Sequence, residues 1–142
     1  MNRRNRAAIR ALAPLALMGM IFLLSAQQAD EGLAWWDFVL RKIGHIGGYA
    51  LLTLLWTWTL VGVTARPVKF AALIAFLYAC TDEYHQSFVE TRNGSAIDVG
   101  IDAIGIALAT CLVSRRPLTR RRESTLPPAA RASSSVHLSD RI

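Results

Sequence analysis

The sequence predicts an all-α protein: an integral membrane four-helix bundle whose N-terminus and C-terminus both lie in the cytoplasm. The first observation is composition, because the 142 residues are 53% hydrophobic and only 18% charged, whereas soluble domains have about a quarter of their residues charged. The second is the set of long charge-free windows, and the third is the uneven distribution of the cations. A net charge of +6 with two cysteines excludes a disulfide scaffold and leaves a basic nucleic-acid binder as the competing class.

The first two predicted helices are each built on a long window without a charged residue. Residues 11–29 are free of charge over 19 positions, and residues 43–65 over 23. Because about 20 apolar residues cross a bilayer as a helix, both windows are long enough to span it. The first window also resembles a signal peptide, since a basic start and an apolar stretch precede Ser25 and Ala26. Cleavage there would leave the sidedness of the remaining helices unchanged.

The third and fourth helices are predicted to carry carboxylates near one end. The charge-free windows 70–81 and 103–114 are each 12 residues long, too short to span alone. Each becomes long enough when the neighbouring acids are included. The predicted helices are then 67–88, with Asp82 and Glu83, and 93–114, with Asp98 and Asp102.

The cations define the expected topology. With four spans, thirteen of the sixteen Lys and Arg residues lie on the cytoplasmic side and eight of the ten acids lie outside, as the positive-inside rule requires. The expected organisation is a basic cytoplasmic N-terminus at 1–10, a transmembrane domain at 11–114 and a basic, disordered cytoplasmic tail at 115–142. The tail has no aromatic residue for base stacking, so nucleic-acid binding is not expected. Its cations are expected to set the topology and to keep the tail soluble, and contact with anionic lipid headgroups is the alternative. The expected location is the inner (cytoplasmic) membrane, with several spans.

Helix two opens with a polar face. Lys42, His45 and Tyr49 are spaced so that all three share one side of the helix near its outer end. Three glycines on this helix are predicted to admit a closely packed neighbour: Gly44, Gly47 and Gly48. The cysteines, Cys80 and Cys111, differ in expected depth by roughly 15 Å, so two free thiols that pack in the bundle are predicted.

The polar residues of helices three and four converge on the same outer end. Gln86 lies one turn after Asp82 and Glu83, Arg92 lies in the connecting loop, and Asp98 and Asp102 are four residues apart on one face. A carboxylate within the membrane costs at least about 2.5–3.5 kcal/mol at mid-bilayer and less near the interface. These acids are therefore expected to pair, to hold protons or to face a wet cavity.

The spacing of these residues resembles the VanZ-like family of small bacterial membrane proteins. The matching elements are Lys42-x-x-His45-x-x-x-Tyr49, Asp82-Glu83-x-His85-Gln86-x-Phe88 and Arg92-x-Gly94-Ser95-x-x-Asp98-x-x-x-Asp102-x-x-Gly105. The resemblance covers roughly residues 10–114. Glu90 and Thr91 stand where the family commonly has a Pro-Gly pair. The resemblance implies four or more spans with the polar groups outside, and a connection with resistance to the glycopeptide teicoplanin.

The leading hypothesis is a site at the outer face that acts on or recognises a cell-envelope substrate, either lipid-linked or a glycan or peptide precursor. His45 is the expected acid or base, and Glu83 or Asp98 the expected general acid, because crowded carboxylates in a low dielectric tend to retain a proton. Arg92 suits a phosphate or carboxylate. The remaining predicted substrate-binding residues are Lys42, Tyr49, Asp82, Gln86 and Asp102. This hypothesis includes no metal and no cofactor.

Two alternatives stay open. One is a metal site drawing on nitrogen and oxygen ligands, although no local metal-binding signature is present; its candidates are His45, Glu83, His85, Asp98 and Asp102. The other is a non-enzymatic membrane component or partner of an envelope complex, in which the polar residues form a structural ion network. A transport path is disfavoured, because the inner halves of the helices contain few polar residues beyond Thr53, Thr57 and Thr59.

Overall fold

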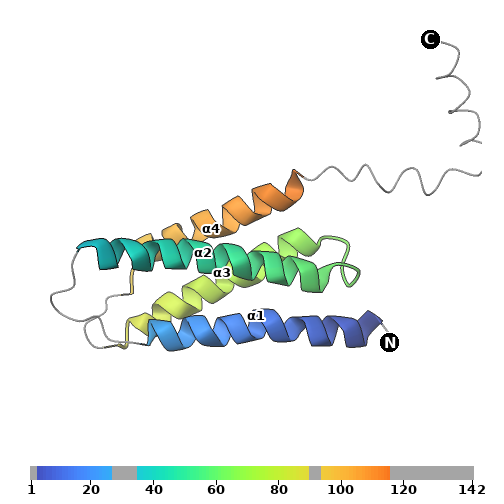
Figure 1. Cartoon of the computed structure of the whole chain (residues 1–142), viewed down its shortest axis with the longest axis horizontal. Coiled ribbons are helices and arrows are strands. Elements are labelled where there is room, and N and C mark those ends of the chain that lie inside the picture. Colours follow the sequence, from blue (N-terminus) through green and yellow to red (C-terminus); the bar gives the residue numbers. More distant parts are fainter. Residues whose placement is uncertain (1–2, 27–34, 90–93, 116–142) are drawn as a thin grey trace, which may run out of the picture.

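The protein folds as four antiparallel helices. The computed structural model describes residues 3–26, 35–89 and 94–115, and within them the helices are α1 (Arg3–Ser25), α2 (Trp35–Leu60), α3 (Pro67–Gln86) and α4 (Ala96–Ser114). The described residues contain no strand, only an isolated bridge between Val61 and Thr64. Successive helices run in opposite directions (Figure 1). The predicted all-α, four-helix architecture is confirmed. The basic tail, beyond residue 115, lies outside the described residues.

The helix ends follow local chemistry. The turn between α2 and α3 uses Gly62, whose φ of +83° is a conformation that glycine adopts without a Cβ penalty, and α3 then begins at Pro67, which suits a first helical position. Ser95 caps α4 by accepting a hydrogen bond from the backbone N–H of Ile97. Helix α2 begins at Trp35, well before the charge-free window 43–65, because a charge ends an apolar window without ending a helix.

The helices are arranged in three layers. Helices α2 and α3 pack together in the middle, α4 packs against both of them, and α1 packs mainly on α2. Within the described residues α1 and α4 do not contact each other, and Figure 1 shows them on opposite sides of the central pair. The end of α1 and the start of α2 therefore lie at the same end of the bundle as the end of α3 and the start of α4.

Small residues allow the central helices to approach closely. Ala71, Ala75 and Ala79 lie one turn apart on α3 and are fully buried. On α4, a Cβ at Gly105 would overlap the backbone carbonyl of Ile46 on α2. The glycine prediction for α2 was wrong for two of its three residues, since only Gly48 faces a neighbouring helix, where a Cβ would lie 3.8 Å from Ile21 of α1. A Cβ at Gly44 or Gly47 would meet nothing within 4 Å, because these glycines lie on the outer side of α2.

Helix α1 is tied into the bundle by side chains at several levels. The hydroxyl of Tyr78 on α3 donates a hydrogen bond to the carbonyl of Met18 at 2.5 Å. The hydroxyl of Thr59 on α2 lies 3.2 Å from the carbonyl of Arg10, and Leu17 is part of the buried core. These contacts make α1 part of the bundle, joined to α2 and α3.

Two helices of the described part are long and apolar enough to cross a membrane: Asn5–Ser25 within α1, and α4. Large apolar side chains are exposed on all four helices, for example Leu23, Trp58, Leu77 and Leu108. Both cysteines are free, as predicted, but both are exposed. The expectation that they pack in the bundle was wrong, because each faces outward from its helix.

Candidate functional site

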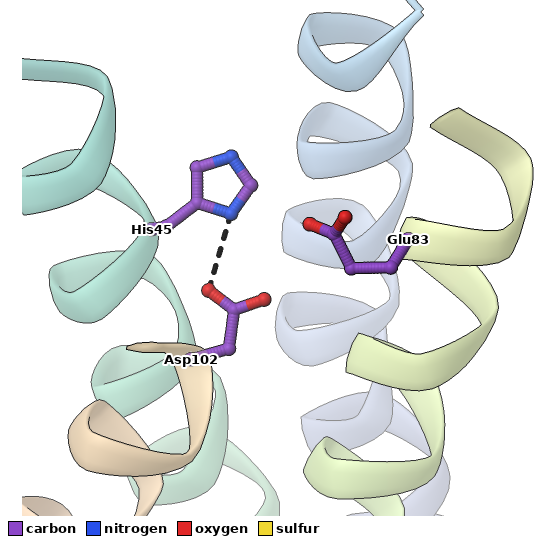
Figure 2. A group of neighbouring side chains, drawn as sticks. All are labelled: His45, Glu83 and Asp102. Carbon is purple, nitrogen blue, oxygen red and sulfur yellow. Dashed lines mark hydrogen bonds and ion pairs between the residues drawn. The ribbon is translucent and has the colours of Figure 1, made fainter. Parts of the chain in front are cut away.

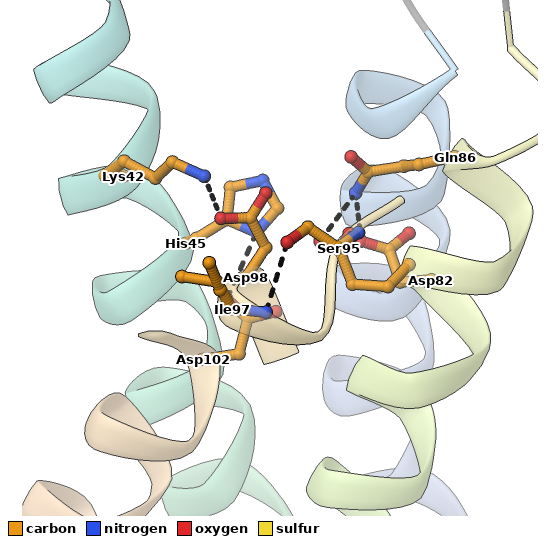
Figure 3. Close-up of polar contacts among 9 residues, drawn as sticks. Lys42, His45, Asp82, Gln86, Ser95, Ile97, Asp98 and Asp102 are labelled. Atoms are coloured by element: carbon orange, nitrogen blue, oxygen red, sulfur yellow. Dashed lines mark hydrogen bonds and ion pairs between the residues drawn. The ribbon is translucent and has the colours of Figure 1, made fainter. Parts of the chain in front are cut away.

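Polar side chains from all four helices meet at one end of the bundle. The group, called the polar cluster below, lies where α1 and α3 end and where α2 and α4 begin (Figures 1 and 3). Its members are Ser25 of α1, Lys42 and His45 of α2, Asp82, Glu83 and Gln86 of α3, and Asp98 and Asp102 of α4. The predicted convergence of helices two, three and four is confirmed, and α1 adds a fourth contributor.

Two charged pairs join α2 to α4. Lys42 forms an ion pair with Asp98, and one helical turn further along, His45 Nδ1 lies 3.1 Å from Asp102 Oδ1. Figure 3 shows both pairs stacked along the interface of the two helices. The four-residue spacing of the two aspartates matches the spacing of Lys42 and His45 closely enough for both pairs to form. Gly105 holds α4 against Ile46, the neighbour of His45, and so fixes the distance between the two helices at this level.

Asp82 is held by side chains from two helices. Its Oδ2 accepts a hydrogen bond from the hydroxyl of Ser25 at 2.8 Å and another from Gln86 Nε2 at 3.2 Å. Asp82 and Ser25 are only 1% and 3% exposed. Because a hydrogen bond to a buried carboxylate is charge-assisted, this contact is a strong link between α1 and α3.

Glu83 is oriented by the start of α4. Its Oε2 accepts a hydrogen bond from the backbone N–H of Ser95 at 3.1 Å, and its Oε1 accepts one from Gln86 at 3.3 Å. The approach depends on Gly94, because a Cβ there would overlap the backbone carbonyl of Glu83. The same segment thus caps α4 through the Ser95 side chain and fixes Glu83 through the Ser95 backbone.

The cluster is deeply buried on one side and open on the other. Asp102 is fully buried, whereas the side chains of His45 and Lys42 are 23% and 25% exposed. Three buried polar atoms here have no hydrogen-bond partner among the described residues: Asp102 Oδ2, Asp82 Oδ1 and the hydroxyl of Tyr49. Since buried polar groups in folded proteins are normally paired, these atoms mark a place where a ligand, water or ion would be accepted.

Most residues predicted from the sequence lie in or beside this cluster, with three qualifications. Tyr49 stacks beside His45 but is fully buried. Its predicted role in binding substrate would therefore require the substrate to reach past the His45 ring. His85 lies apart, stacked on Phe22 of α1 at 4.2 Å between ring centroids. Arg92 lies outside the described residues, and its role stays a prediction.

Sequence reasoning missed two contributors. Ser25 appears in the sequence analysis only beside a possible cleavage point, and Ser95 only within the motif that resembles the family, with no role given to either. The pattern of a capping residue at the start of an acidic helix could have identified Ser95. Nothing in the sequence points to Ser25, because its role depends on how α1 packs against α3.

Three side chains could share an ion. Ligand atoms of His45, Glu83 and Asp102 all lie within 4.8 Å of one another, and Figure 2 shows the three facing a common space between α2, α3 and α4. The other two candidates from the sequence are not part of this group. Asp98 is engaged by Lys42, and His85 packs against Phe22.

Comparisons with known proteins identify one family. A family model described as VanZ/LLP1 matches residues 10–116, a range that contains every residue of the polar cluster. No curated protein matches the chain, and no solved structure matches it.

Proposed function

Because the chain belongs to the VanZ/LLP1 family, we propose that it is a multi-pass protein of the cytoplasmic membrane that binds or transforms the polar part of a cell-envelope precursor at its outer face. The substrate class is a lipid-linked molecule or its glycan or peptide portion. A change in such precursors would alter susceptibility to glycopeptide antibiotics. The family and the cluster support this proposal, and the experiments below test it.

The observation that carries the proposal is the pairing of a partly exposed His45 with a fully buried Asp102. A buried carboxylate that accepts the Nδ1–H of a histidine orients the ring and stabilises its charged form. In Figure 2 the second ring nitrogen points away from Asp102, where it can exchange a proton with a bound group. Glu83 provides a second acid–base group within the same space.

The remaining members position these groups or meet the substrate. Lys42 lies at the open side, beside Asp98, and offers a cation to a phosphate or carboxylate. The proposal gives Asp102 the role of partner to His45, and it gives Asp98 the role of holding Lys42, in place of the acid role that the sequence suggested for Asp98. Arg92 is retained as an anion-binding residue on the sequence alone.

The outer surface of the helices supports insertion of all four. Long apolar side chains are exposed on α2 and α3 as well as on the two most apolar helices, including Ile43, Leu51, Phe70 and Phe76. Contiguous apolar surface of this extent is typical of contact with lipid. The polar cluster would then lie near the outer interface, where a carboxylate costs less than at mid-bilayer.

A labelling experiment tests the orientation. Single cysteines at Ser87, beside the cluster, and at Val63, in the opposite turn, are introduced after Cys80 and Cys111 are changed to Ser. A membrane-impermeant maleimide is expected to label Ser87→Cys in intact spheroplasts and Val63→Cys only after lysis. Labelling of Val63→Cys from outside would contradict the topology.

The functional experiment is a profile of lipid-linked envelope precursors. A deletion strain is compared with strains expressing His45→Gln, Glu83→Gln or the control His85→Gln at equal membrane levels. The control makes the same chemical change as His45→Gln at a histidine that packs outside the cluster. We expect the His45 and Glu83 variants to reproduce the deletion profile and the control to resemble wild type. Wild-type profiles from both cluster variants would contradict the proposal.

A second candidate is a non-enzymatic component of an envelope complex. It is favoured by the hydrogen bonds of the cluster, which link α1 to α3, α2 to α4, and α3 to the start of α4. Links of this kind between helices are expected of a structural network. In that case Glu83→Gln would lower the amount of folded protein and leave the precursor profile per folded molecule unchanged. The unpartnered oxygens of Asp82 and Asp102 favour the first candidate, because a purely structural network would satisfy its buried acceptors.

A further inference from the structure

We infer that His45, Glu83 and Asp102 form a binding site for one divalent transition-metal ion of the Zn²⁺ or Mn²⁺ type. The inference concerns the same cluster and deepens the proposed function, on which its catalytic meaning rests. With the ion bound, His45 Nδ1 and Asp102 Oδ1 would be its ligands in place of the hydrogen bond between them, and the second ring nitrogen would keep its proton. The binding itself can be measured without any activity. Three arguments carry it: the ligand geometry, an orphaned buried oxygen, and the charge balance of the cluster.

The geometry is close to that of a three-ligand site. Two ligands of a tetrahedral ion, each about 2.1 Å from it, lie about 3.4 Å apart, and His45 Nδ1 and Asp102 Oδ1 are 3.1 Å apart. Replacing the shared proton by an ion therefore requires little movement of this pair. Glu83 completes a set whose ligand atoms all lie within 4.8 Å of one another, and its carboxylate would move toward the other two ligands to close the site.

The orphaned oxygen is Asp102 Oδ2. Asp102 is fully buried, and this oxygen has no hydrogen-bond partner among the described residues. Figure 2 shows it directed toward the carboxylate of Glu83. Two ionised carboxylates that face each other repel unless a cation or a shared proton lies between them. An ion at this point would bind the orphaned oxygen and remove the repulsion.

The charge balance also calls for a cation. Among the described residues, Lys42 pairs with Asp98 and His45 with Asp102, while the cluster holds four acids: Asp82, Glu83, Asp98 and Asp102. Asp82 and Glu83 receive hydrogen bonds from the neutral groups of Ser25, Gln86 and Ser95, which orient a carboxylate without neutralising it. Burying an uncompensated charge is costly, and a divalent ion offsets this cost.

The surrounding contacts are those expected around a metal. Ligating carboxylates are usually held by hydrogen bonds from a second layer of residues, and Glu83 is held by the Ser95 backbone and by Gln86. One imidazole and two carboxylates suit a borderline ion such as Zn²⁺ and also Mn²⁺. Three protein ligands leave a coordination position open for water or a substrate oxygen, and the exposed edge of His45 provides a route to it.

The test uses the full-length protein purified in detergent with a tag that contains no histidine. Cys80 and Cys111, which are exposed and free, are changed to Ser so that thiolates do not contribute. The protein is stripped with a chelator and titrated with Zn²⁺ and, separately, with Mn²⁺ by calorimetry. Metal retained after gel filtration is counted by mass spectrometry. One ion per chain is expected. Because Zn²⁺ binds nitrogen and oxygen ligands more tightly than Mn²⁺ at most sites, the ion type is identified by the metal that the protein retains from the cell before stripping.

The variants assign the ligands. Glu83→Gln and Asp102→Asn keep side-chain shape and are expected to raise the Kd for the ion at least about 100-fold. His85→Gln, at a histidine that packs outside the cluster, is expected to change the Kd less than about threefold. Asp98→Asn removes a nearby negative charge but no ligand, and it is expected to weaken binding clearly less than either ligand variant. Circular dichroism and gel filtration report whether each variant is folded.

Several results would overturn the inference. If the folded protein retains no metal and shows no saturable binding of either ion, the cluster holds protons rather than a metal. If Asp98→Asn weakens binding as much as Asp102→Asn does, the ligand set is wrong. Failure of the metal site and failure of the proposed function are distinguishable, because the precursor profile is measured on strains and does not depend on the titration.

Discussion

The two halves of the bundle treat buried polar groups differently. In the half away from the cluster, the hydroxyls of Thr53, Thr57 and Thr59 on α2 each donate to the backbone carbonyl four residues earlier, at 2.8–2.9 Å. The hydroxyls of Thr53 and Thr57 are satisfied within their own helix, and that of Thr59 also lies 3.2 Å from the carbonyl of Arg10 on α1. In the polar cluster the bonds run between helices, and charged oxygens of Asp82 and Asp102 are left without a partner. Hydroxyls that bond the backbone of their own helix indicate a structural role. Hydrogen bonds between helices, together with buried carboxylate oxygens that have no partner, indicate a site.

The comparison also bears on transport. A path across the membrane requires polar groups that face each other at successive depths. The threonines do not provide this, because their hydroxyls are engaged by their own helix. The other unpartnered polar atoms in that half of the described residues, Trp56 Nε1 and Thr110 Oγ1, are neutral. The structure therefore strengthens the argument, made from the sequence, that the polar groups serve one end of the bundle only.

The largest expected effect comes from separating α2 and α4. Gly105→Val would force the backbone of Ile46 away, because even a Cβ at Gly105 overlaps its carbonyl. We expect a loss of about 3 kcal/mol in the free energy of unfolding, measured by thermal unfolding in detergent. Gly47→Val is the matched control, since a Cβ there meets nothing within 4 Å. Equal melting temperatures for the two variants would show that the close approach is not needed.

The next effect is the loss of the bond between α1 and α3. Ser25→Ala removes a buried donor to Asp82, and hydrogen bonds to charged groups contribute about 1.5–3 kcal/mol. Ser87→Ala removes an exposed hydroxyl that bonds only its own turn, and we expect a change within about 0.5 kcal/mol. Chemical denaturation of the two purified variants compares them directly. A Ser25 variant as stable as the Ser87 variant would mean that α1 is not part of the cluster.

The coupling of Lys42 to Asp98 is expected to be smaller. Each side chain is about a quarter exposed, and exposed ion pairs contribute about 0.2–1 kcal/mol. A double-mutant cycle with Lys42→Met and Asp98→Asn isolates this pair from the other contacts of Lys42. A coupling energy above this range would show that the pair mainly stabilises the fold. It would argue against the proposed role of Lys42 in meeting a substrate at the open side of the cluster.

The smallest effect is expected at Thr53 of α2, whose hydroxyl donates to a backbone carbonyl of its own helix. Thr53→Val conserves shape and removes a hydroxyl whose acceptor carbonyl keeps its helical N–H partner. The expected change in the free energy of unfolding is within about 0.5 kcal/mol, with an unchanged precursor profile. A severe loss of stability would contradict the view that these hydroxyls are satisfied locally and add little.

Sequence reasoning recovered the parts of the site that depend on spacing within one helix. The faces formed by Lys42 and His45 and by Asp98 and Asp102 follow from helical periodicity, and the two pairs formed as those faces imply. Membership that depends on packing between helices was not recovered. Ser25 belongs to the cluster because α1 packs against α3. The closest approach of α2 and α4 is at Gly105 and not at the glycines of α2.

Charge-free windows predicted how many helices exist better than where they begin. They mark the apolar thickness of a segment, whereas helix formation continues through charged residues that favour the helix. This explains why α2 starts at Trp35 and contains Arg41 and Lys42. His85 illustrates the complementary limit. It adjoins the acids in sequence, but the helical period turns it toward Phe22 on α1.

The most direct measurement of the central claim compares one residue from each half in the same strain. Asp102→Asn and Thr57→Val are expressed at equal membrane levels in the deletion strain, and the lipid-linked envelope precursors are profiled. The account predicts the deletion profile for Asp102→Asn and the wild-type profile for Thr57→Val. A wild-type profile for Asp102→Asn, in folded protein at normal abundance, would contradict it.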